Sequence, residues 1–233
     1  MTEKNSNNRL IRFLRGFIPP KEILIVCILF YILGIVFAFL NPDLARLTFP
    51  GGMFLSNIEA KIQLPSSITL DYVFNQFFSY LGAVSFNIFL HNLSLMLLCI
   101  FSGIAIFPII LIGLFMEMGT ISFFLVEKLG FTGVIALLGS FHIYFEFLAG
   151  LLAIDAFFKF YISFVNALKD KKIEIFKNNI INDFSPLVLR IILLLAIAAI
   201  LEVFWSTWWV YILTNHYVSW YEFYFGAYSV LVK

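Results

Sequence analysis

Two side chains capable of proton or metal chemistry lie one helical turn apart in a strongly apolar stretch of the sequence. His142 and Glu146 occur within SFHIYFEFLAG, residues 140–150. On a helix, residues four apart share one face, where an imidazole and a carboxyl can hydrogen-bond or exchange a proton. Such a pair could also supply two metal ligands, with a third, such as Glu202, needed to complete the site. The sequence therefore places ionisable groups where their neighbours are almost all apolar.

The composition indicates that these groups lie inside a membrane. Hydrophobic residues make up 62% of the 233 residues and charged residues only 12%, whereas soluble domains are about half apolar and a quarter charged. The mean hydropathy is +0.98. Abundant Phe and Tyr suit lipid-facing helix surfaces and interfacial belts. We expect an all-α, polytopic transmembrane helical bundle with about five spans, located in the cell membrane and surrounded by lipid.

Charge and apolar length together predict how the chain crosses the membrane. The predicted membrane segments are residues 22–40, 72–91, 93–118, 132–158 and 187–213, preceded by a basic cytoplasmic N-terminus, 1–21, and followed by an aromatic interfacial C-terminus, 214–233. A lysine cluster over residues 159–177 should stay in the cytoplasm, so four crossings must precede it. Residues 72–118 must then supply two of them, with a turn near His91 and Asn92. The alternative is that residues 72–91 form an interfacial or re-entrant helix, because their polar residues recur on one face.

Ionisable residues in the middle of spans need an explanation, since each charge costs roughly 2.5–3.5 kcal/mol even on lenient insertion scales. Glu146 and Glu202 lie near the middle of their predicted spans, and small residues beside them would let the two helices approach closely. We expect Glu146, Glu202 and His142 to share a polar pocket in which at least one carboxyl is protonated. Secondary polar candidates are Asn87, His91, Asn92 and Glu117. The cluster could lock helices together, carry protons or a substrate, or perform chemistry.

The sequence lacks the motifs of several enzyme classes. It contains no HExxH, GxSxG, GxxxxGK[ST] or CxxC motif, which removes the usual signals of zinc proteases, esterases, nucleotide hydrolases and metal fingers. We therefore set these enzyme classes aside and expect no cofactor or metal; any other enzyme would need a water-filled cavity that reaches His142, together with a nucleophile. Nucleic acid is not an expected partner, and the net charge of +1 carries no information about one.

Four segments resemble the stage II sporulation protein M family over roughly residues 70–213. FHIYFE resembles the family's Pro-His-Gly-x-x-Glu element, and LLLAIAAILEVF resembles its last, Ala-rich span ending in Ile-Glu-x-Phe. NIFLHN and FSGIAIFPIILIGLFMEMG follow the same order as two further family elements. His142, Glu146 and Glu202 match the motif positions, whereas Phe141 and Ile143 replace its Pro and Gly. Ile112-Gly113 likewise stands in place of an Asn-Gly, which marks a divergent member.

This resemblance implies a function through partners. The family's namesake is a membrane scaffold that holds peptidoglycan-degrading partners in endospore formers. By that likeness, this chain would be a non-enzymatic scaffold or assembly component acting through membrane protein partners or a homo-oligomer. The alternative from a different class is a channel or transporter for a proton, cation or small polar substrate, with His142, Glu146 and Glu202 as its midplane site.

Overall fold

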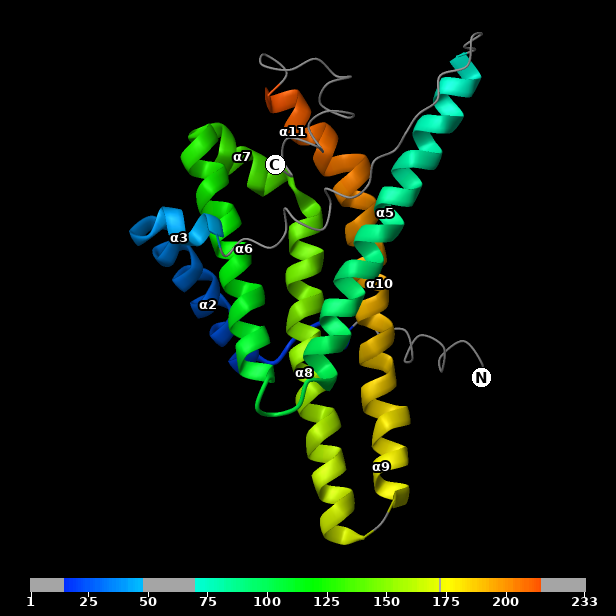
Figure 1. Cartoon of the computed structure of the whole chain (residues 1–233). Coiled ribbons are helices and arrows are strands. Elements are labelled where there is room, and N and C mark those ends of the chain that lie inside the picture. The colour runs from blue at the N-terminus through cyan, green and yellow to red at the C-terminus, as the bar shows by residue number, and fades with distance from the viewer. Residues whose placement is uncertain (1–14, 48–69, 172, 215–233) are drawn as a thin grey trace.

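The computed structural model describes residues 15–47, 70–171 and 173–214, and within these ranges all regular secondary structure is helical. The α-helices are α2 (Lys21–Leu40), α3 (Pro42–Leu47), α5 (Leu70–Phe101), α6 (Phe107–Leu129), α7 (Phe131–Gly139), α8 (Phe141–Asp170), α9 (Ile173–Asn179), α10 (Ser185–Leu201) and α11 (Thr207–Thr214). Two π-helical segments flank α10: η1 (Ile180–Phe184) and η2 (Glu202–Ser206). Figure 1 shows the long helices running side by side.

Local sequence explains where several of these helices begin and end. Pro108 lies in the first turn of α6, where its missing N–H removes no helical bond, and Gly130 ends the helix at a φ of 59°. Lys171 ends α8 in the left-handed conformation, with a φ of 52°. Pro186 lies in the first turn of α10 and cannot donate to the preceding turn, and η1 lies directly before that turn. The Ser185 hydroxyl donates to the carbonyl of Ile180 and so satisfies part of this irregular turn.

Within the described residues, five stretches of helix are long and apolar enough to cross a membrane. They are Lys21–Leu40, Leu81–Phe101, Phe107–Leu129, Phe141–Asp170 and Ile173–Leu213. The predicted all-α bundle with about five spans is therefore confirmed, and four spans precede the lysine-rich segment. Residues 1–14 of the predicted N-terminal segment and all but Thr214 of the predicted C-terminal segment lie outside the described residues.

The predicted turn at His91 and Asn92 is wrong. α5 runs without interruption through both residues, so the predicted segments 72–91 and 93–118 are not separate helices, and an independent interfacial helix is equally excluded. Polar side chains alone do not end a helix inside a membrane, because the helix satisfies its own backbone groups. The turn lies at residues 102–106, where Gly103 adopts a φ of 84° and its carbonyl accepts from the N–H of Phe107. The number of crossings is unchanged because α6 supplies the next one.

The predicted fourth span, 132–158, also differs from the structure. The chain breaks at Ser140, which separates the nine-residue α7 from the 30-residue α8. α8 then continues to Asp170, well beyond the predicted end. The prediction ended the span at residue 158 because Lys159 begins the lysine-rich segment, which was expected to lie outside the membrane.

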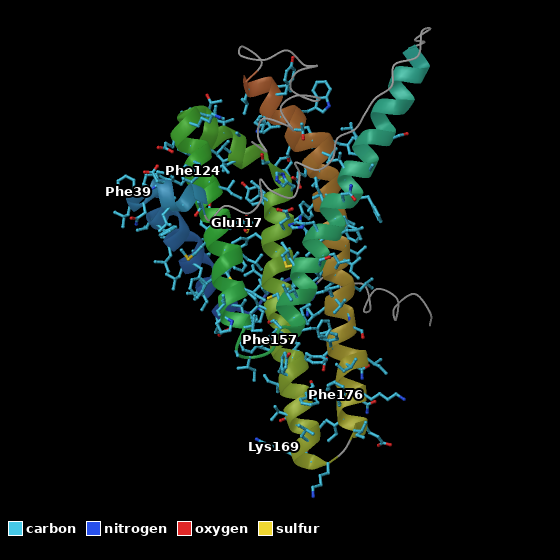
Figure 2. The ribbon with its side chains drawn as sticks, in the orientation of Figure 1. Phe39, Glu117, Phe124, Phe157, Lys169 and Phe176 are labelled. Carbon is cyan, nitrogen blue, oxygen red and sulfur yellow. The ribbon has the colours of Figure 1, made fainter. Side chains whose placement is uncertain are left out.

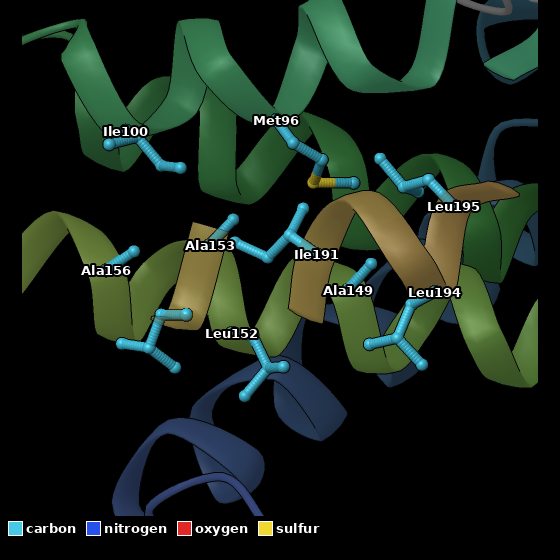
Figure 3. Close-up of a cluster of buried hydrophobic side chains, with 10 residues drawn as sticks. Met96, Ile100, Ala149, Leu152, Ala153, Ala156, Ile191, Leu194 and Leu195 are labelled. Atoms are coloured by element: carbon cyan, nitrogen blue, oxygen red, sulfur yellow. The ribbon is translucent and has the colours of Figure 1, made fainter. Parts of the chain in front are cut away.

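The central core forms where α5, α8 and α10 meet (Figure 3). Alanines on α8 allow the larger side chains of the other two helices to pack closely. The buried side chains of this cluster are Met96, Ile100, Ala149, Leu152, Ala153, Ala156, Leu187, Ile191, Leu194 and Leu195. The helices that carry the predicted glutamates are thus in direct contact.

α2 and α6 form a second tightly packed pair beside α8. A Cβ added at Gly34 would collide with the backbone carbonyl of Met116, and one at Gly119 with the carbonyl of Tyr31. The two backbones therefore touch across two glycines, the close approach that small residues permit in membranes. The Tyr31 hydroxyl also donates to Ser122 Oγ over 2.7 Å, which fixes the register of the pair.

The second half of α8, together with α9, forms a helical hairpin that projects beyond the N-terminal end of α6 (Figure 1). Phe160 packs against Phe176 and Phe184, with ring centroids 5.8 and 5.4 Å apart. Figure 2 shows Lys169 near the tip and Phe176 on the facing helix. The lysine-rich segment is thus a folded extension of the bundle.

Candidate functional site

The most direct contact of the polar cluster joins α5 to α8. Asn92 Nδ2 donates to Glu146 Oε1 over 2.6 Å, and both side chains are half-buried. Asn92 lies on the inner face of α5, between the buried Ile88 and Met96. A residue predicted only as a secondary candidate is therefore the hydrogen-bond partner of the principal glutamate.

Glu202 reaches the same region from the last span. Its carboxyl is close enough to that of Glu146 for the two to interact electrostatically. Glu202 opens the π-helical segment η2, and its carbonyl accepts from the Thr207 hydroxyl over 2.8 Å. π-Helical turns are rare and recur at functional sites, because they redirect side chains that a regular helix would place elsewhere. The helical segment that Glu202 begins packs against both α5 and α8.

His142 lies one turn before Glu146, but its hydrogen-bond partner is Ser206 on η2. Its Nδ1 is 2.6 Å from Ser206 Oγ at the other end of η2. The cluster therefore contains two separate side-chain hydrogen bonds, one between His142 and Ser206 and one between Asn92 and Glu146. Ser206 was not predicted, although its spacing of four residues from Glu202 is a signal that sequence inspection could have used.

The break between α7 and α8 brings a further set of polar contacts next to His142. The indole N–H of Trp205 donates to the carbonyl of Gly139 over 2.8 Å, and that of Trp209 donates to the carbonyl of Ile135 over 3.1 Å. Ser140 Oγ donates to the carbonyl of Ala136 over 2.7 Å. Gly139 and Ala136 lie in the last turn of α7, where a helix leaves backbone carbonyls without helical partners, so Trp205 and Ser140 supply donors there. The family's Pro-Gly pair is missing here, yet the helix is still broken directly before His142.

The remaining predicted candidates lie away from these contacts. Asn87 and His91 are exposed on the outer face of α5, whereas Glu117 lies half-buried on α6 (Figure 2). Asp155 and Lys159 form an ion pair of 2.8 Å one helical turn apart on α8. None of these five residues lies on the inner face of α5 or on η2, which carry the hydrogen-bond partners of Glu146 and His142.

The described side chains set limits on the chemistry available. No three His, Cys, Asp or Glu side chains among them are grouped closely enough to hold a metal ion, so Glu202 does not complete a three-ligand site with His142 and Glu146. The cluster contains one imidazole, two carboxyls, an amide and a hydroxyl. This set can link helices through hydrogen bonds, and its carboxyls can bind or release a proton.

Comparison with known proteins identifies the family of the chain. A family model described as stage II sporulation protein M matches residues 23–207, a range that begins in α2 and ends just after η2. No curated protein and no solved structure matches the chain. The matched range covers well over half of the sequence and includes His142, Glu146 and Glu202, so the chain belongs to the stage II sporulation protein M family.

Proposed function

We propose that this multi-pass membrane protein is a scaffold or assembly component, without enzymatic activity, that acts through membrane protein partners. The observation that carries the proposal is the pairing of the cluster's side chains across helices. Asn92 on α5 binds Glu146 on α8, and His142 on α8 binds Ser206 at the end of the last span. Interhelical hydrogen bonds of this kind stabilise helix packing in membranes by about 0.6 kcal/mol on average. A scaffold needs such fixed geometry between the surfaces it presents.

The distribution of charge supports an orientation with the N-terminus in the cytoplasm. The guanidinium of Arg190 lies against Gly16 just before the first span, which places the start of α2 near the start of α10. The hairpin formed by α8 and α9 projects from the same end of the bundle and carries Lys169 near its tip (Figures 1 and 2). Basic residues gathered at one end are typical of the cytoplasmic side. This end would then meet cytoplasmic partners.

A second candidate function rests on the two neighbouring carboxyls. Glu146 and Glu202 interact from adjacent spans, and Glu202 begins a π-helical segment. Paired carboxyls within a membrane are a common component of proton and cation pathways. In this candidate function the two glutamates bind a proton, a cation or a small polar substrate.

A flux measurement separates the two functions. We would reconstitute the purified protein into liposomes and compare proton and cation flux through the wild type and the Glu146→Gln, Glu202→Gln double variant. The scaffold predicts no flux in either and equal thermal stability, because glutamine still donates and accepts hydrogen bonds. Flux that is lost in a folded double variant would replace the scaffold with a transporter. The Asn87→Gln variant serves as a control that leaves the cluster intact.

A further inference from the structure

Two hydroxyl side chains of the last span make the same unusual bond to their own helix. Ser185 Oγ donates to the carbonyl of Ile180 over 2.8 Å. Thr207 Oγ1 donates to the carbonyl of Glu202, also over 2.8 Å and also five residues back along the chain. Each hydroxyl directly follows a π-helical segment, η1 in the first case and η2 in the second. The first carbonyl of each π turn therefore accepts twice, from the backbone N–H and from the hydroxyl of one residue.

Three other serine hydroxyls of the described chain bond one residue nearer. Ser94, Ser122 and Ser140 each donate to the carbonyl four residues back. That acceptor is the one that an α-helical turn places beside a hydroxyl. A π turn is wider by one residue and places the fifth carbonyl there instead. The bonds of Ser185 and Thr207 are thus specific to the widened turns.

The two π turns differ in their other sources of irregularity. Pro186 follows Ser185 and has no N–H to donate to the preceding turn, so η1 has a second reason to depart from α-helical geometry. The residues of η2 are EVFWS, without proline or glycine. Across η2 the Thr207 hydroxyl provides the side-chain bond, and no proline supports it.

The extra residue in η2 sets the direction of the side chains that follow it. One residue of an α-helix turns by about 100°, so relaxation of η2 to α-helical form would rotate the following segment by that angle. Trp209 on α11, which donates to the carbonyl of Ile135 on α7, would rotate with it. Trp205 would take the direction that Ser206 has now, toward His142. The contacts of this segment with α7 and α8 therefore depend on the π-helical form of η2.

We propose that Thr207 is a positioning residue, whose hydroxyl holds η2 in the π-helical form and so sets the rotation at which the end of the last span meets α7 and α8. The hydroxyl bonds within its own helix, yet it determines which side chain faces His142. Serine at this position would keep the bond, whereas valine has nearly the same shape and no donor. This inference goes beyond the proposed function, because it applies to a scaffold and to a transporter alike.

Disulfide cross-linking reports the register of η2. In a background with both native cysteines replaced by serine, His142→Cys is combined with either Ser206→Cys or Trp205→Cys, and the yields of the two cross-links are compared. Thr207→Val should lower the ratio of the Ser206→Cys product to the Trp205→Cys product about two- to tenfold, the factor that corresponds to the loss of one hydrogen bond. Thr207→Ser should retain the wild-type ratio. An unchanged ratio in a folded valine variant, or an equal change in the serine variant, would overturn the proposal.

Two controls separate rotation of the last span from general disruption. Ser185→Ala removes the corresponding hydroxyl of η1, where Pro186 remains, and should leave the ratio unchanged. A shift as large as that of Thr207→Val would contradict a role specific to η2. A cross-link between Asn92→Cys and Glu146→Cys joins α5 to α8 without the last span and should form equally in all variants. Thr207→Ala should act like Thr207→Val, so the test does not depend on how valine packs.

Spin labels on exposed positions give a second readout that leaves the polar cluster intact. Ile200 and Ile212 are similarly exposed, at 55% and 56%, but Ile200 lies before η2 and Ile212 after it. Thr207→Val should lower the oxygen accessibility of a label at Ile212→Cys, because residue 212 would turn toward the half-buried direction of Leu213. A label at Ile200→Cys should not change. Equal responses at the two positions, or none at either, would overturn the proposal. Neither measurement depends on proton or cation flux, so this inference and the proposed function can fail separately.

Discussion

Asn92 and Glu146 connect two spans through a hydrogen bond of 2.6 Å, and the carboxyl of Glu202 completes the group. Replacing Asn92 with leucine removes the amide N–H that donates to Glu146 Oε1. We expect Asn92→Leu to lower the free energy of unfolding in detergent by about 1–2 kcal/mol. Asn87→Leu on the outer face of the same helix is the matched control and should not destabilise the detergent-solubilised monomer. Equal losses for the two variants would show that the Asn92 bond contributes nothing specific.

The pairing of His142 with Ser206 can be measured through its coupling energy. We expect the His142→Ala, Ser206→Ala double-mutant cycle to give about 0.6 kcal/mol of coupling in thermal or denaturant unfolding. Ser94 supplies the control, since its hydroxyl bonds within its own helix. The Ser94→Ala and His142→Ala effects should add. Additivity in both cycles would contradict a direct bond between the imidazole and the Ser206 hydroxyl.

The residue types of the site were predictable, but only part of their pairing was. Mid-span carboxyls are rare enough to identify Glu146 and Glu202 from hydropathy alone. The partner of His142 was not predictable, because η2 changes which side chains of the last span face α8. The polarity of Asn92 suggested a turn. Its side chain instead pairs with the Glu146 carboxyl on another helix, a contact that the sequence does not reveal.

Among the elements, α2 and α6 illustrate packing by glycine. Gly119 sits against the backbone of Tyr31, whereas Gly113, earlier on the same helix, has no atom within 4 Å of an added Cβ. We expect Gly119→Ala to lower the unfolding free energy by about 1–3 kcal/mol through overpacking. Gly113→Ala should be neutral or stabilise by up to about 1 kcal/mol, because alanine favours the helix. Chemical unfolding of the two variants in one detergent provides the comparison, and equal effects would argue against the tight contact.

The elements also show where prediction from sequence reached its limit. The lengths of the apolar segments and the position of the lysine-rich segment were sufficient to predict five spans. Both features depend on the thickness and sidedness of the bilayer and on no tertiary contact. The end of α5 was missed because the turn at Gly103 depends on one backbone conformation inside an apolar stretch. The break at Ser140 was missed because it depends on tryptophans more than sixty residues later in the chain.

At the scale of the whole molecule, the order of the spans predicts which loops face the same side of the membrane. The turn at residues 102–106 and the tip of the hairpin should face the same side of the membrane, because α6 and α8 cross in opposite directions between them. In a Cys27→Ser, Cys99→Ser background, we expect Ala105→Cys and Lys171→Cys to react with an impermeant maleimide from the cytoplasmic side only. Leu90→Cys, inside the span, should not react. Labelling of the first two variants from opposite sides would refute this order of crossings.

The capping of α7 has a consequence for how the molecule matures. The carbonyls of Gly139 and Ile135 accept hydrogen bonds from indoles that lie 66 and 74 positions later in the sequence. A ribosome makes the acceptors first, so the junction before His142 is synthesised several seconds before the donors that complete it, at about 5–20 residues per second. The last span therefore does more than anchor the C-terminal part of the chain. The last span supplies the indole donors of this junction, so a nascent chain that ends before Trp205 cannot form these hydrogen bonds.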